Sequence, residues 1–304
     1  MARNVLDDDC LFYWQVEPSV IFGRNQLIGN EVNLGYCKSH AIDIFRRKSG
    51  GGCVYADKNN VMFSFITGEE NVGLTFNRYI NMMVLMLKRM GVNASATGRN
   101  DIVVDGRKVS GNAFYHIPGR SIVHGTMLYD TDMDNMTRSI TPQGDKLKSN
   151  GVESVRQRVA LLKDYVGLSI DDFKAYIKEN LCDGKHALTK HDISKIERIE
   201  QDVYASDEFI YGKDPRCAVT CKRRIEGVGN MEAHMEIKGG KIKDIRLSGD
   251  FFAIGDITGK ICDGLKGVEY ERGAVGKALP GRLDDVIMNL GKDDFVNLLF
   301  NTNH

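Results

Sequence analysis

The chain has 304 residues, with 41 basic and 41 acidic side chains, so its formal net charge is zero. This balance argues against a protein built around bulk attraction to nucleic acid or to an anionic membrane, although local basic patches are compatible with it. Apolar residues make up 42% and charged residues 27%. These are ordinary globular values, so a disordered or fibrous chain is not expected.

The sequence predicts no membrane attachment. No stretch approaches the roughly 18 consecutive apolar residues that a membrane span needs, and the first ten residues contain no apolar core of an export signal. The seven cysteines are scattered and odd in number. Without an export signal we interpret them as reduced thiols and expect a cytoplasmic protein. We also expect a monomer.

The first half of the chain predicts short strands and one long helix. Strands are expected at residues 11–15 and 19–23. Residues 74–90 predict a helix, because their apolar side chains recur at helical spacing and Gly91 follows as a C-terminal stop. The apolar stripe consists of Phe76, Ile80, Met83, Val84 and Leu87.

The middle of the chain continues with strands and then with helices. Asp105-Gly106 lies between the apolar residues 102–104 and residues 107–110 and predicts a tight type I′ hairpin turn. A further strand is expected at residues 121–129. Ser169 is a plausible N-cap of a helix, and another helix is marked by spaced apolar residues. These are Ile193, Ile196, Ile199 and Val203.

The order of these elements predicts the α+β class, because strands and helices do not alternate regularly. The polar, Gly- and Pro-bearing residues 211–216 suggest a domain boundary. We therefore expect a large domain at residues 1–211 and a small α+β domain at residues 217–304, with short helices around residues 261–265 and 283–290.

A glycine-rich segment at residues 46–55, RRKSGGGCVY, has the composition of an anion site. Three consecutive glycines allow close backbone approach and expose N–H donors, and the preceding cations attract anions. A flexible turn with solvated charges is the simpler interpretation. The segment is neither a Walker A loop nor a dinucleotide fingerprint.

Two later features could carry chemistry. Lys108 lies among small and polar residues next to the hairpin turn, where a lysine can stabilise a negatively charged transition state. His124 lies in an expected strand, where a histidine is more often structural. Residues 138–163 hold six basic and two acidic side chains, which suits a solvated loop or a mobile lid over a phosphate.

Taken together, these segments resemble the lipoate-protein ligase A family over nearly the whole chain, including a small C-terminal accessory domain. No single motif is specific, but their order and spacing are. The motifs are FGRNQ at 22–26, RRKSGGGCVY at 46–55, GRNDIVV at 98–104, RKVSGNAF at 107–114, HGT at 124–126, SVRQRV at 154–159 and YGKDP at 211–215.

The resemblance implies a two-step ligation on a fold like that of biotin protein ligases, with a mixed sheet packed by helices. Lipoate and ATP would give lipoyl-adenylate and pyrophosphate, and the lipoyl group would pass to a carrier lysine. The implied cofactor is Mg²⁺. The implied carriers are apo lipoyl domains of 2-oxoacid dehydrogenase complexes and the glycine cleavage H protein. Which carrier is modified, and whether octanoate also serves, is left open.

The resemblance also implies roles for individual residues. Lys108 would contact the acyl carbonyl and phosphate oxygens. The lipoate and phosphate site would comprise Arg47, Ser49, Gly50, Gly51, Gly52 and His124. The nucleotide site would comprise Tyr55, Asn100, Asp101, Ser154, Val155 and Arg156, with Asp101 a candidate ligand of Mg²⁺.

The chain departs from the family pattern in places. In the family a strand and an N-L-A-x-E-E helix precede the segment at Leu11, and this sequence begins too late for both, so a truncated start or a lost element is expected. Ala56 stands where a histidine is common, and Phe209 lies near the position of a common tryptophan.

Two other functions remain open from the sequence. An octanoyl- or lipoyl-transferase of the same fold takes acyl groups from a carrier protein without ATP. One branch uses a cysteine nucleophile, and Cys53 lies nearest the expected site. The second alternative is a non-catalytic protein that binds lipoate or its adenylate.

Overall fold

The computed structural model describes residues 9–98, 100–140, 157–211 and 219–300. The chain forms two compact units. The first unit holds Met1–Phe22, Ile28–Arg47 and Cys53–Tyr211, and the second holds Gly23–Leu27, Lys48–Gly52 and Gly212–His304. Two short segments from the N-terminal part of the sequence, the loops at 23–27 and 48–52, therefore pack with the C-terminal part.

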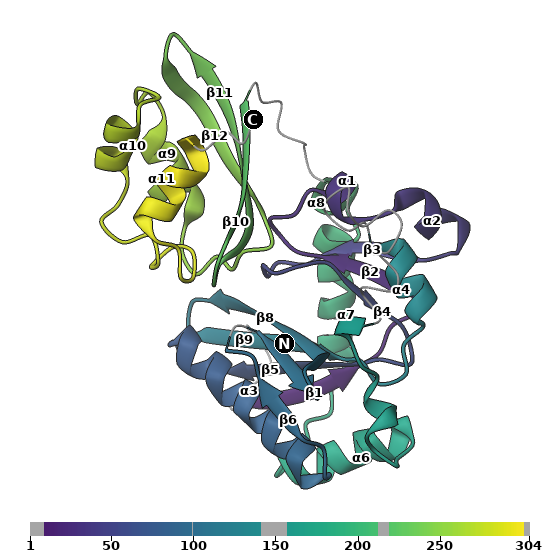
Figure 1. Ribbon diagram of the computed structural model, residues 1–304. Coiled ribbons are helices and arrows are strands. Elements are labelled where there is room, and N and C mark those ends of the chain that lie inside the picture. Colours follow the sequence, from purple (N-terminus) through teal and green to yellow (C-terminus); the bar gives the residue numbers. More distant parts are fainter. Residues whose placement is uncertain (1–8, 99, 141–156, 212–218, 301–304) are drawn as a thin grey trace. The chain divides into compact units, whose positions relative to one another are not determined.

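An antiparallel six-stranded sheet forms the centre of the first unit, in the order β1-β5-β9-β8-β7-β6 (Figure 1). The hairpin between β7 and β8 turns at Asp105 (φ 49°) and Gly106 (φ 75°). Two positive φ angles are the signature of a type I′ turn, so the hairpin prediction is confirmed. The strands are β1 Cys10–Trp14, β5 Val61–Thr67, β6 Ala94–Ala96, β7 Asp101–Val104, β8 Arg107–Ile117 and β9 Arg120–Met127.

Helix α3, Val72–Arg89, runs along one face of this sheet (Figure 1). It begins where the Asn71 side chain accepts a hydrogen bond from Leu74 N, and Gly91 follows its end at φ 83°. All five residues of the predicted stripe are buried, and Phe76 packs edge-on against Phe114 of β8. The helix therefore covers the face that carries Phe114 and Val123, and His124 lies on the opposite face.

A small mixed sheet, β3-β2-β4, forms the second layer of the first unit. Strand β2 (Ser19–Phe22) pairs in parallel with β3 (Asp43–Arg46) and antiparallel with β4 (Val54–Ala56). The mixed sheet expected from the sequence is thus the smaller of the two in this unit. Its core includes Val20, Phe22, Ile42, Tyr55, Leu128 and Met136. The neighbouring helices are α1 Ile28–Glu31, α2 Leu34–Ser39 and α4 Met133–Ser139.

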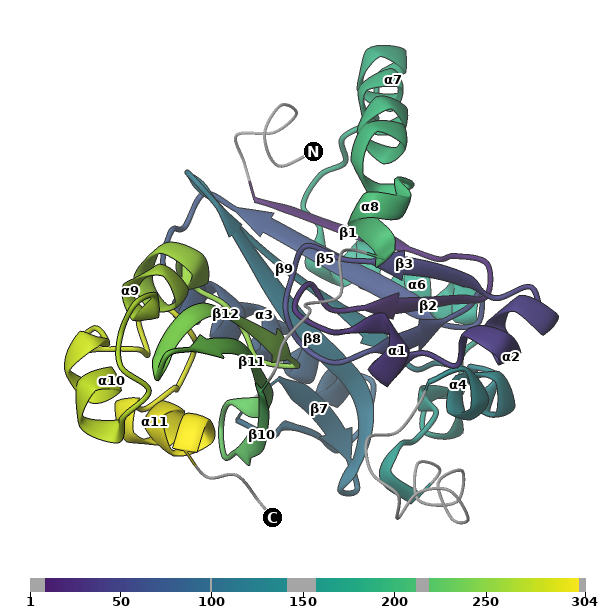
Figure 2. The ribbon, with the colours of Figure 1, turned by 90° about the horizontal axis from the view of Figure 1, so that it is seen from above.

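The remaining helices of the first unit follow the sequence prediction in position. Ser169 caps α6 (Ile170–Leu181) by accepting a hydrogen bond from Asp172 N. Helix α7 (Lys190–Ile199) extends away from the sheet of its own unit (Figure 2). Its isoleucines are 37–45% exposed, so the apolar spacing identified the helix but not a buried face. The other elements are η2 Leu162–Asp164, the π-helical turn η3 Glu200–Tyr204 and α8 Asp207–Tyr211.

The second unit is a three-stranded antiparallel sheet with helices on one face (Figure 1). Gly239 and Gly240 turn the chain between β11 and β12 at φ 60° and 74°. Apolar side chains of the sheet and helices form one core. The elements are β10 Val219–Ile225, β11 Gly229–Lys238, β12 Lys241–Gly249, the π-helical turn η4 Thr258–Cys262, α9 Asp263–Leu265, α10 Arg272–Ala278 and α11 Lys292–Phe300.

One predicted helix of this unit is wrong. Residues 283–290 form turns with an isolated bridge between Ile287 and Ala253, and the helices lie on either side, in α10 and α11. The apolar spacing there reflects burial, since Leu283, Val286, Ile287 and Leu290 are each at most 1% exposed. Periodicity alone cannot separate a short buried helix from buried turns.

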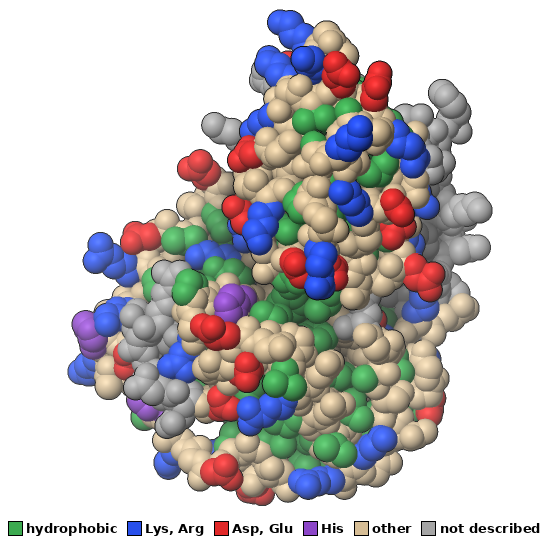
Figure 3. Space-filling view, turned by 90° about the vertical axis from the view of Figure 1, so that its left-hand side faces the viewer, with side chains coloured by type: hydrophobic (Ala, Val, Ile, Leu, Met, Phe, Trp, Pro, Cys, Tyr) green, Lys and Arg blue, Asp and Glu red, His purple; other side chains and the backbone are tan. Residues whose placement is uncertain are grey.

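The fold class predicted from the sequence, α+β with a large unit and a small C-terminal one, is confirmed by these elements. On the face drawn in Figure 3, acidic and basic side chains are interspersed and form no large patch of one sign. This agrees with the zero net charge. Among the described residues, no helix is both long and apolar enough to cross a membrane.

Candidate active site

The hairpin β7–β8 holds Lys108 in a defined position. Its Nζ lies 2.8 Å from Asp101 Oδ1, and the two side chains are 36% and 29% exposed. Asp101 pairs with Gly111 across the strands. A Cβ atom on Gly111 would lie 2.7 Å from Lys108 Nζ and 2.8 Å from its Cε. The lysine therefore lies across Gly111 and can do so only because that residue has no side chain.

Asn100 and Asn112 fix the open end of this hairpin. Asn100 Nδ2 donates to Asn112 O at 3.1 Å, and Asn112 Nδ2 donates to Asn100 O at 3.0 Å. A Cβ on Gly125 would lie 1.9 Å from Asn112 Oδ1, so Gly125 provides the space for this amide. The Asn100 side chain, next to Asp101, therefore donates a hydrogen bond to the neighbouring strand β8.

His124 and Arg47 form a second polar group in the first unit. His124 pairs with Ala113 on β8 and with Ser64 on β5, and Gly111 lies two positions along β8, on the same face of the sheet. Burial lowers the pKa of His124 to about 3, and the positive charge of Arg47 lowers it further in the same direction. The imidazole is therefore neutral at physiological pH.

Arg47 is held by the small sheet. Its Nη1 donates to Ile21 O at 2.9 Å, and its backbone N–H donates to Phe22 O at 3.0 Å. Burial lowers its pKa to about 10, while Cys53 and Glu31 oppose this shift. The guanidinium accordingly stays charged at neutral pH, and a buried positive charge is suited to holding a carboxylate or phosphate.

The glycine loop makes a different contact from the one expected. In the second unit, a Cβ on Gly50 would lie 2.3 Å from Phe251 O. Gly51 (φ 88°) donates its N–H to the same oxygen at 3.4 Å. Ser49 is 3% exposed. Gly52, by contrast with Gly50, has open space where a side chain would be. Close approach by Gly50 and Gly51 is thus to protein backbone, and their part in ligand binding stays a prediction.

Two further candidates lie close to the loop in sequence. Tyr55 is 2% exposed within the core of the small sheet, so its side chain is closed to a nucleotide. Burial, followed by the negative charge of Glu31, raises the pKa of the Cys53 thiol far above its usual value. A nucleophilic cysteine needs the opposite shift. Ser154, Val155 and Arg156 lie outside the described residues, as does most of the loop or lid expected over residues 138–163.

Sequence reasoning missed the roles of Gly111, Asn112 and Gly125. All three lie inside quoted motifs, RKVSGNAF and HGT, but their function appears only in the strand pairing. The signal that could have found them is a glycine between two polar residues in each motif, at residues 110–112 and 124–126.

Comparisons with known proteins identify the family. Residues 1–182 match the lipoyl protein ligase A/B catalytic domain, and residues 214–299 match the bacterial lipoate protein ligase C-terminus. Lipoate-protein ligase LplJ of Bacillus subtilis is 34% identical, with 95% of this chain and 90% of that one covered.

Solved structures give the same result. LipL1 of P. falciparum in complex with lipoate is 25% identical with a TM-score of 0.70, covering 96% of this chain and 85% of that one. A lipoate-protein ligase A bound with ATP is 26% identical with a TM-score of 0.59, covering 68% and 87%. A bi-partite ligase, described with its E2 lipoyl domain, from Thermoplasma acidophilum is 27% identical with a TM-score of 0.63, covering 70% and 88%. The chain belongs to the lipoate-protein ligase family.

Proposed function

We propose that the polar face around Lys108 catalyses both steps of ATP-dependent lipoate–protein ligation, the activity of this family. In the first step the lipoate carboxylate attacks the α-phosphorus of ATP and pyrophosphate leaves. In the second step a carrier lysine attacks the acyl carbonyl, forms an amide and releases AMP. The observation that carries this proposal is the position of Lys108 Nζ, held over Gly111 by Asp101.

Lys108 supplies positive charge where negative charge develops. Both steps place charge on oxygens next to the reacting atom, and a preorganised cation stabilises that charge. The ion pair with Asp101 is partly exposed, so it contributes little stability and can be exchanged for a substrate oxygen. Asp101 thus keeps the lysine extended until an anion replaces it.

Arg47 and His124 would bind the acyl end of the substrate. The charged guanidinium pairs with the lipoate carboxylate, and the neutral imidazole contributes a hydrogen bond without adding charge to a buried site. Ser49, Gly50, Gly51 and Gly52 are proposed to bind lipoate or phosphate as well, and Gly52 has open space where a side chain would be.

The nucleotide end would lie by Asn100 and Asp101, with the backbone of Tyr55 and residues 154–156. Mg²⁺ fits this assignment in one respect, since it is commonly held by one or two carboxylates together with substrate phosphates. Among the described residues no group of three His, Cys, Asp or Glu side chains could hold a metal alone. Asp101 would hold the ion with the phosphates, and the ion would neutralise phosphate charge.

The partners and domain roles are proposed on the same basis. The acceptors would be apo lipoyl domains of 2-oxoacid dehydrogenase complexes and the glycine cleavage H protein. The E2 lipoyl domain named with the Thermoplasma acidophilum ligase supports this choice. Residues 1–211 would form the catalytic domain and residues 217–304 an accessory domain.

The test is mass spectrometry of an apo lipoyl domain incubated with the protein, ATP, Mg²⁺ and lipoate. The expected result is a gain of one lipoyl group that requires both ATP and lipoate. Lys243→Ala, which removes an exposed lysine paired with Glu236 at 2.9 Å in the second unit, is the matched control and should retain the reaction. Modification without ATP would point to the transferase alternative, and an unmodified domain would contradict the proposal.

A further inference from the structure

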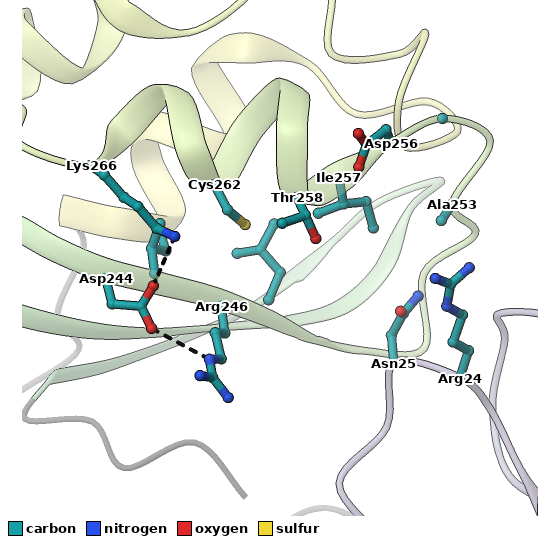
Figure 4. A pocket seen from close by; sticks show the side chains of 13 residues that line it. Arg24, Asn25, Asp244, Arg246, Ala253, Asp256, Ile257, Thr258, Cys262 and Lys266 are labelled. Carbon is teal, nitrogen blue, oxygen red and sulfur yellow. Dashed lines mark hydrogen bonds and ion pairs between the residues drawn. The ribbon is translucent and has the colours of Figure 1, made fainter. Parts of the chain in front are cut away.

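A pocket of about 610 Å³ lies within the second unit and is lined by none of the residues assigned above, although the backbone N–H of its lining residue Arg24 donates to Ser49 O at 2.9 Å (Figure 4). The loop at residues 23–27 forms one side, β12 forms another, and the segment that leads into η4 and α9 closes it. The lining residues used below are Arg24, Asn25, Asp244, Arg246, Ile257 and Thr258.

The loop belongs to the FGRNQ motif, for which the proposed ligation has no role. Gln26 is 2% exposed, and its Oε1 accepts a hydrogen bond from Gly23 N at 2.7 Å. Asn25 O accepts from Gly249 N at 2.7 Å. Gly23 and Gln26 therefore build a closed turn that is fastened to β12. The two residues between them, Arg24 and Asn25, direct their side chains to the pocket (Figure 4).

A second guanidinium enters from β12 and is oriented by a carboxylate. Arg246 Nε lies 3.4 Å from Asp244 Oδ2, and Asp244 Oδ1 lies 3.4 Å from Lys266 Nζ. This pairing uses Nε of Arg246 and leaves its Nη groups for a ligand. The other acidic residue of the pocket, Asp256, accepts a hydrogen bond from Gly259 N at 3.0 Å. The two carboxylates are thus engaged within the unit.

The pocket also offers uncharged groups. Asn25 Nδ2 is buried and has no acceptor among the described residues, so a ligand oxygen could satisfy it after a small rotation. The Thr258 hydroxyl faces the pocket, and Ile257 and Ala253 provide an apolar wall (Figure 4). Burial raises the pKa of Cys262 to about 11, so this thiol is a neutral wall group.

We propose that this pocket is a second ligand site, which binds the oxyanion group of a small molecule through Arg24, with Asn25 and Thr258 as hydrogen-bond partners, while Arg246 adds positive charge at the other end of the pocket (Figure 4). Guanidinium groups recognise phosphate and carboxylate through paired N–H donors. Two sources of that chemistry are at hand for a ligase of this kind: a pyrophosphate group and the carboxylate of a free acyl acid. The site lies in one unit, and its binding does not depend on the reaction at Lys108.

The test is calorimetric titration of the full-length protein with inorganic pyrophosphate and, separately, with lipoate. The Lys108→Ala variant serves as background, so that binding at the catalytic site is reduced. Hydrogen exchange then locates the bound probe through residues 244–247 and 253–262. The Arg24→Gln, Arg246→Gln double variant is compared with Lys260→Gln, which removes one charge from an exposed residue of η4 outside the pocket.

We expect one probe to bind and to slow hydrogen exchange in those two segments. The double variant should bind that probe about tenfold more weakly, a loss of about 1.4 kcal/mol in binding free energy. Lys260→Gln should bind as the background does. Pyrophosphate binding identifies a phosphate site, and lipoate binding a carboxylate site. The proposal is overturned if neither probe slows exchange there, or if the double variant binds as tightly as the control.

Discussion

Glycines serve different purposes in the two units. In the first unit, Gly111 and Gly125 make room for the polar side chains of Lys108 and Asn112, whose atoms would lie 2.7 Å and 1.9 Å from added Cβ atoms. In the second unit, Gly50 and Gly249 make room for backbone: the nearest atoms are Phe251 O at 2.3 Å and Asn230 O at 2.0 Å. Gly111 makes room at the candidate site, Gly125 makes room for the amide that links β8 to Asn100 on the other face of the sheet, and the second pair shapes the packing of the chain.

This difference predicts different consequences of substitution. A flexible side chain such as lysine can move aside, so a clash with it displaces a functional group at little cost in stability. A backbone carbonyl inside a sheet cannot move without disturbing its neighbours, so a clash with it lowers the free energy of unfolding. The comparison can be tested by substituting one glycine of each kind.

The largest expected effect is that of Gly249→Ala. Its φ of 143° is strained for alanine, and the added Cβ would meet Asn230 O. Strain and overpacking together should lower the free energy of unfolding by about 3–5 kcal/mol, measured by denaturant unfolding. Gly240→Ala is the control, because its φ of 74° is also positive but nothing lies within 4 Å of an added Cβ. Equal losses in the two variants would contradict the backbone-clash explanation.

Gly111→Ala should affect activity more than stability. The new methyl group would push Lys108 Nζ away from Asp101, and misplacing a catalytic group by about 1 Å can cost on the order of 100-fold in rate. We expect a loss of about 10- to 100-fold in lipoate-dependent ATP–pyrophosphate exchange. Gly68→Ala, whose Cβ would make an ordinary 3.6 Å contact with Arg120, should retain the rate. A Gly111→Ala variant with wild-type exchange would show that the lysine need not lie across this residue.

The neutral His124 predicts a pH-dependent stability. Its pKa is about 3 in the folded protein and near 6.5 when unfolded. Between these values the unfolded chain binds more protons, so stability is full above about pH 6.5 and falls as the pH is lowered. The loss between pH 6.5 and 4.5 is at most about 2.7 kcal/mol, at 1.36 kcal/mol for each pH unit.

Urea unfolding at several pH values checks this prediction. The slope of stability with pH should be smaller in His124→Gln, because glutamine does not titrate. His191→Gln, which replaces an exposed histidine of α7, should keep the wild-type slope. An unchanged slope in His124→Gln would mean that the histidine is not held neutral by the fold.

The smallest effect is expected for Cys53→Ser. The thiol is kept protonated by burial and by Glu31, so it is unsuited to nucleophilic attack. The variant should retain most of the ligation rate, measured by lipoyl transfer to the apo domain. An acyl group found on Cys53 in the intact wild-type protein, together with loss of activity in the variant, would instead support a cysteine-dependent transferase.

The sequence predicted much of the fold because its signals are local. The α3 stripe, the Ser169 cap and the Asp105-Gly106 turn each depend on neighbouring residues, and all three are confirmed. The buried turns at 283–290 were mistaken for a helix because burial there depends on distant elements.

Prediction of the candidate active site was limited in the same way, because sequence signals report only on neighbouring residues. Lys108 could be singled out from its small and polar neighbours and from the family motifs. Its ion pair with Asp101 and its position over Gly111 could not be predicted, because the pairing of Asp101 with Gly111 is a property of the sheet register. The contact of Gly50 with Phe251 joins positions about two hundred residues apart in the chain, and no local pattern reports it.

The most direct test of the central claim is lipoate-dependent ATP–pyrophosphate exchange by Lys108→Ala, beside the wild-type protein and Lys243→Ala. The account predicts a loss of about 10²- to 10³-fold in the Lys108 variant, with an unchanged unfolding midpoint, because the ion pair with Asp101 is partly exposed and contributes little to stability. Exchange at close to the wild-type rate in a folded Lys108→Ala protein would contradict it.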